Sequence, residues 1–167
     1  MTMLKIYPAE TEEELEAVKQ LFTVYADYIF EVFSPHNFSL AERIRQRTLD
    51  EANNLPGEYA MPKGCILLAE YQGAIAGCVA VSEIAGELCE LKRLYVKPYF
   101  RRMGIGKNLA NAIIEKAVQL KYKRMRLGTN ELFTGAKELY SSLGFKEAGH
   151  IESSSLKSSV YMELKLV

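Results

Sequence analysis

The sequence predicts a mixed α/β (α+β) fold, in which helices cover both faces of a mixed, mostly antiparallel central sheet. Three observations indicate this class of fold. Segments with helical periodicity lie on either side of the middle of the chain, three strand-like segments follow one another closely there, and the expected element order is β-α-α-β-β-β-α-β-α-β-β. No linker, low-complexity tract or internal repeat divides the 167 residues, so we expect one domain over residues 1–167.

The N-terminal region is expected to begin with a strand and an amphipathic helix. Residues 4–9 have the apolar pattern of a short strand. Thr11 and Glu14 then have the spacing of a capping box, which starts a helix by satisfying its first backbone N–H groups. The apolar side chains that follow recur on one helical face: Leu15, Val18, Leu21, Phe22 and Tyr25.

A second, more polar helix is expected over residues 39–52. Ser39 and Glu42 have the spacing of a second capping box at its start. The Phe-rich segment 30–38, broken by one proline, is expected to be the loop between the two helices. Residues 53–64 contain two prolines and two glycines, so we expect them to be irregular.

The middle of the chain is expected to form three antiparallel strands in a row. Residues 65–72 and 74–84 flank Gly73, which is a hairpin signal. Residues 87–96 follow so closely that only a tight connection fits between them and the preceding strand.

The C-terminal half is expected to alternate helices and strands. A long amphipathic helix is predicted over residues 106–120, followed by a strand at 123–129 and a short helix at 135–143. Strands at 145–151 and 160–166 are expected to complete the sheet.

Composition excludes several classes of function. Lys and Arg number 21, and so do Asp and Glu, so no net field attracts nucleic acid or an anionic membrane. The apolar runs are far shorter than the roughly 20 residues of a spanning helix, and the acidic N-terminus does not have the pattern of a secretory signal. Cys65, Cys78 and Cys89 fit neither a zinc pattern nor a disulfide framework. We therefore expect no metal and a reducing, cytoplasmic location.

The most informative segment is residues 96–110, where a strand ends and a glycine-containing loop leads directly into the long helix. Such a junction exposes unpaired backbone N–H groups at the positive end of the helix dipole, which suits phosphate. Gly104 and Gly106 lack the Cβ atoms that would keep a diphosphate from the backbone, and Arg101 and Arg102 add positive charge. The spacing lacks residues that a Walker A or a Rossmann loop requires. The alternative is a plain strand-to-helix turn with solvated arginines.

Two motifs in this part of the chain resemble those of the GNAT superfamily of N-acetyltransferases, which bind acetyl-CoA. The motif V-x-P-x-x-[RQ]-x-x-G-x-[GA] is matched by Val96, Pro98, Arg101, Gly104 and Gly106. Residues 136–145 resemble the family's A-x-x-L-Y-x-x-x-G-F segment. The resemblance extends from about residue 64 to the end, and the N-terminal helical part is similar in architecture only. It implies a single N-acetyltransferase domain with a GNAT-like sheet whose strands splay at the CoA site.

The resemblance also implies which residues bind acetyl-CoA, the acyl donor. Backbone amides of the loop would hold the CoA diphosphate beside Arg101, here those of Arg102, Met103, Gly104, Ile105, Gly106 and Lys107. The pantetheine arm would bond like an added strand to Leu94, Tyr95 and Val96. That mode needs a gap between splayed strands, and a β-bulge near residues 94–96 is the usual device.

Two positions depart from the family's pattern. Arg102 stands where many members carry glycine. Phe133 stands where many members place an asparagine near the cofactor, so that contact is either absent or supplied by Asn130.

Tyr140 aligns with the family's tyrosine that protonates the departing CoA thiolate. A thiol with a pKa of about 8.5 leaves as an anion, and a phenol with a pKa of about 10 can donate a proton to it. The alternative is a structural role, in which Tyr140 packs on the apolar face of its helix beside Leu139 and Leu143.

An attacking amine must first lose a proton, and Glu90 is the first candidate for the base. It lies 11 residues before Arg101, where some members of the family place a catalytic glutamate. Strand alternation predicts that Glu90 shares a face with Lys92 and Leu94, in a partly apolar cleft that raises the pKa of a carboxylate. The alternatives are Glu83, a water, or a structural role in which Glu90 pairs with Lys92 or a neighbouring base.

The expected function is therefore transfer of an acetyl group from acetyl-CoA to an amine of an unidentified small molecule or peptide. No cysteine has an evident nucleophile setting, which favours direct transfer in a ternary complex. The competing hypotheses are a non-catalytic acyl-CoA-binding sensor or interaction module and a nucleotide-binding regulator. A homodimer is common in such scaffolds.

Aromatic side chains are expected to cover the acceptor end of the cleft, with carboxylates available to hold a cation. The aromatic residues are Tyr25, Tyr28, Phe30 and Phe33, together with the 53–63 loop. The carboxylates are Glu31, Glu51 and Glu58.

Overall fold

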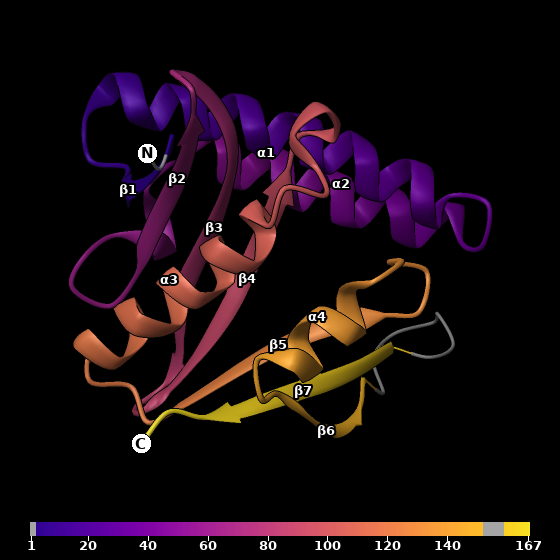
Figure 1. Cartoon of the computed structure of the whole chain (residues 1–167). Coiled ribbons are helices and arrows are strands. Elements are labelled where there is room, and N and C mark those ends of the chain that lie inside the picture. Colours follow the sequence, from indigo (N-terminus) through magenta and orange to yellow (C-terminus); the bar gives the residue numbers. More distant parts are fainter. Residues whose placement is uncertain (1–2, 152–158) are drawn as a thin grey trace.

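In the computed structural model, which describes residues 3–151 and 159–167, seven strands form one sheet in the order β1-β2-β3-β4-β5-β7-β6 (Figure 1). The strands are β1 Leu4–Pro8, β2 Cys65–Tyr71, β3 Ala74–Ala85, β4 Leu88–Val96, β5 Arg124–Asn130, β6 Lys146–His150 and β7 Ser159–Lys165. The α-helices of the described residues are α1 Glu12–Phe33, α2 Phe38–Asn53, α3 Ile105–Gln119 and α4 Ala136–Ser142. Short 3-10 segments, η1 Gly57–Tyr59 and η2 Pro98–Phe100, lie between them. The element order matches the sequence prediction.

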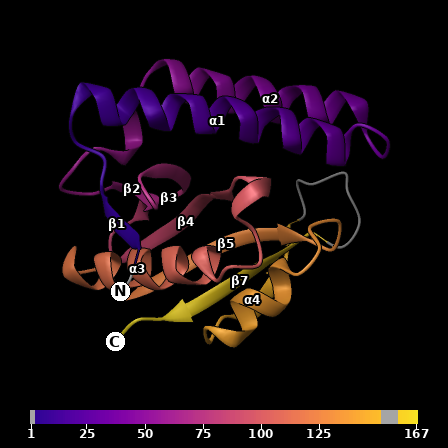
Figure 2. The same cartoon turned by 45° about the horizontal axis from the view of Figure 1, so that its top comes forward.

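Helices cover both faces of this sheet, as predicted. Figure 2 shows α1 and α2 side by side over one face, with α3 and α4 on the other. Helix α1 buries Val18, Leu21 and Phe22 against β2 and β3, because these side chains recur on one helical face. The chain therefore has the three-layered arrangement that its amphipathic helices imply.

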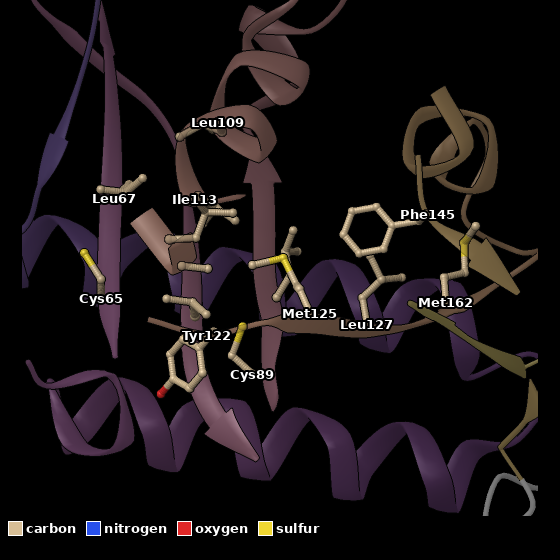
Figure 3. Close-up of a cluster of buried hydrophobic side chains, with 14 of the residues drawn as sticks. Cys65, Leu67, Cys89, Leu109, Ile113, Tyr122, Met125, Leu127, Phe145 and Met162 are labelled. Carbon is tan, nitrogen blue, oxygen red and sulfur yellow. The ribbon is translucent and has the colours of Figure 1, made fainter. Parts of the chain in front are cut away.

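The larger core lies between the sheet and α3. Leu109 and Ile113 of α3 pack against Leu67 of β2 and against Met125 and Leu127 of β5 (Figure 3). Burying each such side chain stabilises the fold by roughly 1.5–3 kcal/mol. This packing fixes where the N-terminus of α3 lies relative to the end of β4.

The sheet is antiparallel except between β4 and β5, where it opens. Only three residue pairs join these two strands: Leu88 with Arg124, Cys89 with Met125, and Glu90 with Arg126. Beyond Glu90 the two strands diverge (Figure 1), as the sequence analysis predicted for the CoA site. The edge of β4 from Leu91 onward therefore has no β5 partner.

The connection between α1 and α2 differs from the prediction. The Thr11–Glu14 capping box is present, with the Glu14 N–H donating to Thr11 Oγ1 at 3.1 Å. However, α1 continues through Phe33, because Ile29 and Phe33 extend its buried face and pack against Ala41 of α2. The predicted loop over 30–38 is therefore wrong for residues 30–33 and for residue 38, where α2 begins.

The predicted second capping box is also wrong. The N-cap of α2 is Asn37, whose Oδ1 accepts a hydrogen bond from the Leu40 N–H at 3.0 Å. Ser39 lies within the first turn of the helix. Asparagine is as effective an N-cap as serine, so Asn37 can start the helix without Ser39.

The remaining elements agree with their predicted ranges to within one or two residues. All three cysteines are buried and free, as expected for small core side chains. Among the described residues, no helix is long and apolar enough to span a bilayer.

Candidate active site

A bulge in β4 forms the wall of the site. Arg93 has a φ of +59°, and the register between β3 and β4 shifts where Cys78 pairs with Tyr95 but Ala80 pairs with Lys92. The extra residue reverses the direction of the side chains that follow it. Leu94 packs in the core beneath α3, whereas Tyr95 packs on the α1 side.

The bulge overturns one prediction and confirms another. Leu94 does not share a face with Lys92, because strict alternation fails at Arg93. A bulge beside the splayed strands was expected near 94–96, and it lies at 93–94. Gly77 on β3 permits it, since a Cβ there would lie 2.4 Å from the Tyr95 carbonyl oxygen.

A buried ion pair holds the bulged residue to α2. The Arg93 guanidinium donates to both oxygens of Glu51, at 2.7 and 3.1 Å, and the two side chains are 12% and 15% exposed. Glu51 also accepts a hydrogen bond from the Tyr59 hydroxyl at 2.6 Å. Burial raises the pKa of Glu51, but the hydrogen bond and charge of Arg93 and the Tyr59 hydroxyl outweigh it and hold the pKa below its ordinary value.

A cavity of about 680 Å³ occupies the gap where β4 and β5 diverge. Its walls come from α1, β4, the loop before α3, β5 and α4, so it joins segments far apart in sequence. Eleven of the residues predicted to be catalytic or to bind the cofactor line it: Glu90, Leu94, Tyr95, Val96, Arg101, Arg102, Gly104, Ile105, Gly106, Lys107 and Tyr140.

Two of the predicted cofactor-binding residues do not line the cavity. Met103 lies at the tip of the loop and is exposed. Asn130 is buried, where its side chain donates to Ser159 Oγ at 2.9 Å and accepts from the Leu132 N–H at 2.9 Å. Phe133 lines the cavity and packs on Tyr28 and Phe33.

The N-terminus of α3 presents a row of backbone donors to the cavity. The first intrahelical bond runs from the Asn108 N–H to the Gly104 carbonyl. Among the described residues, the N–H groups of residues 102–107 donate to no backbone acceptor, and Gly104 offers no side-chain cap. A helix dipole adds partial positive charge at this point, so the loop suits an anion.

Two residues of this loop have left-handed backbone conformations. Gly104 has a φ of +80°, which glycine adopts without strain. Arg102 has a φ of +64°, which costs a residue with a Cβ roughly 1–2 kcal/mol. This positive φ is a physical reason for the glycine that many members of the resembled family carry where this chain has Arg102.

Arg101 braces the loop against the cavity wall. Its Nε donates to the Val96 carbonyl at 2.9 Å. Its guanidinium lies over the rings of Tyr28 and Tyr95, at 5.4 and 5.6 Å from their centroids. Arg101 therefore places a positive charge at the junction of β4, α1 and the loop.

Tyr140 projects from α4 into the cavity. Its ring packs edge-on against Phe145, and it is half-buried. Burial raises the pKa of the phenol, and nearby Tyr25 raises it further. Tyr140 is therefore protonated at neutral pH, with a hydroxyl that can donate.

Glu90 lies at the last pair of β4 and β5 before they diverge. Within the described part of the chain it has no ion-pair partner within 4.0 Å, because Lys92 pairs instead with Glu58 at 3.1 Å and Glu51 at 3.8 Å. Burial raises the pKa of Glu90, although Lys92 and Arg93 oppose the shift. Glu83, the second candidate base, pairs with Lys63 at 3.2 Å and does not line the cavity.

The residues expected to cover the acceptor end are only partly brought together. Tyr25 and Tyr28 line the cavity, whereas Phe30 packs against Phe38 and Phe33 lies behind Phe133. Of the carboxylates expected to hold a cation, Glu51 and Glu58 are ion-paired, and Glu31 is exposed outside the cavity.

The comparisons with known proteins identify the family. The sequence model of the acetyltransferase (GNAT) family matches residues 19–145, which is most of the chain. The chain therefore belongs to this family, and it is an acyltransferase enzyme of the GNAT N-acetyltransferase type.

Individual proteins agree with this assignment. The uncharacterized N-acetyltransferase C1271.07c of Schizosaccharomyces pombe is 37% identical over 123 residues, which cover 72% of this chain and 76% of that protein. The N-acetylaspartate synthetase of Danio rerio is 38% identical over 100 residues, covering 59% of this chain and 36% of that protein. The structure of YncA from Salmonella typhimurium, solved with its cofactor acetyl-CoA, has the same fold, with a TM-score of 0.70 at 18% identity over 99% of this chain and 95% of that one.

The sequence analysis missed the role of Arg93 and its ion pair with Glu51. The available signal was that two charged residues, Lys92 and Arg93, follow one another in β4, which strict alternation does not explain in a strand with both faces covered. The partner of Arg93 lies 42 residues earlier in the chain, on α2, so the spacing of residues along β4 does not identify it.

Proposed function

We propose that residues 1–167 form one N-acetyltransferase domain that moves an acetyl group directly from acetyl-CoA to an amine in a ternary complex. The observation that carries the proposal is the row of backbone amides at the start of α3, which donate to no backbone acceptor among the described residues and open onto the cavity that Glu90 and Tyr140 line.

The donor's diphosphate fits the loop before α3. Gly106 has no positive φ, and the nearest contact to an added Cβ would be an ordinary 3.8 Å to Val96 Cγ2. The fold itself therefore does not require glycine here, although glycine costs a helix roughly 1 kcal/mol relative to alanine. The close approach of a diphosphate to the backbone would explain why this position is glycine.

The pantetheine arm fits the free edge of β4. Leu94 belongs to the bulge and Tyr95 and Val96 follow it, where β4 has no β5 partner and its backbone faces the gap. An extended chain with amide groups can bond to such an edge as an added strand does. This arrangement would direct the thioester toward Glu90 and Tyr140.

The proposed chemistry uses one base and one acid. Glu90 takes a proton from the acceptor ammonium, directly or through a water, and the free amine forms an N–C bond to the thioester carbonyl. The C–S bond then breaks, the Tyr140 hydroxyl protonates the leaving sulfur, and the nitrogen loses its second proton to solvent, from which Tyr140 is reprotonated. The products are the N-acetyl amine and CoA thiol.

The cysteines support direct transfer over a covalent acetyl-enzyme. None of the three lines the cavity, and burial raises the pKa of Cys78 and of Cys89 to about 12. A protonated, buried thiol is a poor nucleophile.

The acceptor is proposed to be the amine of a small molecule or peptide. N-acetylaspartate synthetase, to which part of this chain is similar, is named for an N-acetylated amino acid. The balanced charge of 21 basic and 21 acidic residues does not favour a nucleic-acid or membrane partner. The free cysteines fit a cytoplasmic location, and a homodimer agrees with the family's common assembly.

A two-stage experiment tests the proposal against a non-catalytic acyl-CoA sensor. Acetyl-CoA and CoA are expected to raise the melting temperature. ATP is expected to leave it unchanged, because ATP has no pantetheine arm to bind the edge of β4. An amine panel with thiol detection is then expected to show acceptor-dependent CoA release. Binding without release on any amine would favour the sensor.

A further inference from the structure

Arg126 is a cation on the sheet beside the cavity that the proposed chemistry does not use. It lies on β5 directly opposite Glu90, in the last pair before the strands diverge. The next two residues of β5, Leu127 and Gly128, line the cavity. Side chains of directly paired residues project from the same face of a sheet, so Arg126 and Glu90 lie side by side at its edge.

The neighbours of Arg126 leave its charge only partly compensated. Its Nη2 lies 3.5 Å from Glu163 Oε2, while Arg124 holds the other oxygen of Glu163 at 2.8 Å. One carboxylate is therefore shared by two guanidinium groups. The guanidinium of Arg126 also lies 5.1 Å over the ring of Tyr161, which contributes no formal charge.

Among the described residues, one donor of Arg126 has no partner. Its Nε is buried and makes no hydrogen bond within the described residues. Such groups are rare in folded proteins, because losing water without a replacement bond costs about 1–3 kcal/mol. An oxygen anion on this face would accept a hydrogen bond from the guanidinium.

Glu90 and Arg126 together match the two charges of an amino acid. They form no ion pair with each other within 4.0 Å, although adjacent strands lie only about 4.8 Å apart. An α-amino acid carries its ammonium and its carboxylate on the same carbon, so the two groups can reach neighbouring side chains. The carboxylates expected to hold a cationic acceptor, Glu51 and Glu58, are already ion-paired.

We infer that the acceptor is an amino acid whose carboxylate binds Arg126 while its amine lies at Glu90. This inference rests on the proposed N-acetyltransferase function and names the substrate class of the same site. The carboxylate takes no part in bond making: the nitrogen still forms the bond to the acetyl carbon, and the C–S bond still breaks. Arg126 is thus a specificity-determining residue.

The test compares free amino acids with their α-amides as acceptors. The panel holds the twenty common L-amino acids, β-alanine and the matching amides, and thiol release is measured with saturating acetyl-CoA. The wild-type enzyme is expected to acetylate at least one free acid with a kcat/KM about ten-fold or more above that of its amide, because a charge-assisted bond is lost.

Variants assign that preference to Arg126. Arg126→Gln is expected to raise KM for the acid about ten-fold or more, to leave KM for acetyl-CoA unchanged, and to abolish the preference over the amide. Arg126→Lys should keep part of the preference, since it keeps the charge. Lys165→Gln is the matched control, because it removes the same charge from an exposed position at the end of β7. It should leave KM unchanged. Melting temperatures confirm that each variant folds.

The outcomes separate this inference from the function on which it rests. If the amides or other amines are acetylated but no free amino acid is, or if the amides react as well as the acids, the amino-acid inference is wrong and N-acetyltransfer stands. If acetyl-CoA binds and no amine releases thiol, both are overturned in favour of the sensor. A preference that survives in Arg126→Gln also overturns the amino-acid inference. Failure of acetyl-CoA to bind overturns both.

Discussion

A substitution of Gly106 is the most direct single-residue test of the proposed donor binding. Neither its backbone angles nor the packing around it requires glycine. Gly106→Ala is therefore expected to raise the free energy of unfolding by up to about 1 kcal/mol and yet to weaken CoA binding, because the new methyl group occupies the diphosphate's approach. Chemical denaturation and calorimetric titration measure the two effects.

Asn108→Ala is the matched control for this substitution. Asn108 is exposed in the same helical turn and does not line the cavity, so alanine there should improve helix propensity without affecting CoA. Equal CoA affinity in wild-type and Gly106→Ala protein would contradict the proposed cradle.

Tyr140 is predicted to act on the leaving group rather than on binding. Tyr140→Phe keeps the ring and its edge contact with Phe145 but removes the only proton that the side chain can donate. We expect kcat to fall about ten-fold or more, with little change in acetyl-CoA affinity. Steady-state turnover equal to wild type would show that Tyr140 has only a packing role.

Glu90 is predicted to govern the acidic limb of the pH–rate profile. A base must be ionised, so kcat/KM should fall as the pH drops through the raised pKa of Glu90, which lies above the ordinary carboxyl value of about 4.3. Glu90→Gln should lower kcat and remove this limb. An unmoved profile in the variant would eliminate Glu90 as the base, and Glu83→Gln is the control that should behave as wild type.

At the scale of elements, an ion pair joins β4 to α2 beside the site. Arg93 holds a positive φ in the bulge, and Glu51 fixes its guanidinium through two bonds. Glu51→Gln is expected to destabilise the fold by about 3 kcal/mol and to weaken acetyl-CoA binding, because the edge of β4 then loses its anchor. Asp50→Asn, an exposed neighbour on the same helix, should change neither property.

The same pair predicts how stability depends on pH. The lowered pKa of Glu51 means that its contribution is complete above the ordinary carboxyl pKa and is lost as the pH falls through the folded-state value. Thermal melts between neutral pH and about pH 3 should therefore show a smaller acid-induced loss in Glu51→Gln than in the wild type. If melting temperature falls equally with pH in the wild type and in Glu51→Gln, the ionisation of Glu51 does not contribute to the pH dependence of stability.

The elements also show which local signals suffice to predict structure. The Thr11 capping box and the Gly73 hairpin depend on neighbouring residues alone, and both were predicted correctly. The end of α1 was not, because Phe33 packs against α2, a contact that the neighbouring residues in the sequence do not reveal. Strand alternation likewise failed at Leu94, since the bulge at Arg93 depends on β3 and α2.

At the scale of the whole molecule, the candidate site was partly predictable. The loop glycines, Glu90 and Tyr140 were found because motif spacing identifies them, and the structure brings them to one cavity. Arg126 was not predicted as a site residue, because its place beside the site depends on the β4–β5 register that sets it opposite Glu90. Asn130 was expected to touch the cofactor, but its side chain bonds to β7 and to the following loop.

The molecule as a whole joins two halves of a sheet around one opening. Helix α3 packs on β1 to β4, on one side of the opening between β4 and β5, and α4 packs on β5, on the other side (Figure 1). Donor binding in that opening would contact both halves, and every later step of the proposed reaction depends on it.

Isothermal titration of coenzyme A into the purified protein is the most direct test of this claim. The account predicts a saturable heat that corresponds to one coenzyme A per chain and is weakened in Gly106→Ala. The absence of any heat of association at millimolar coenzyme A would contradict it.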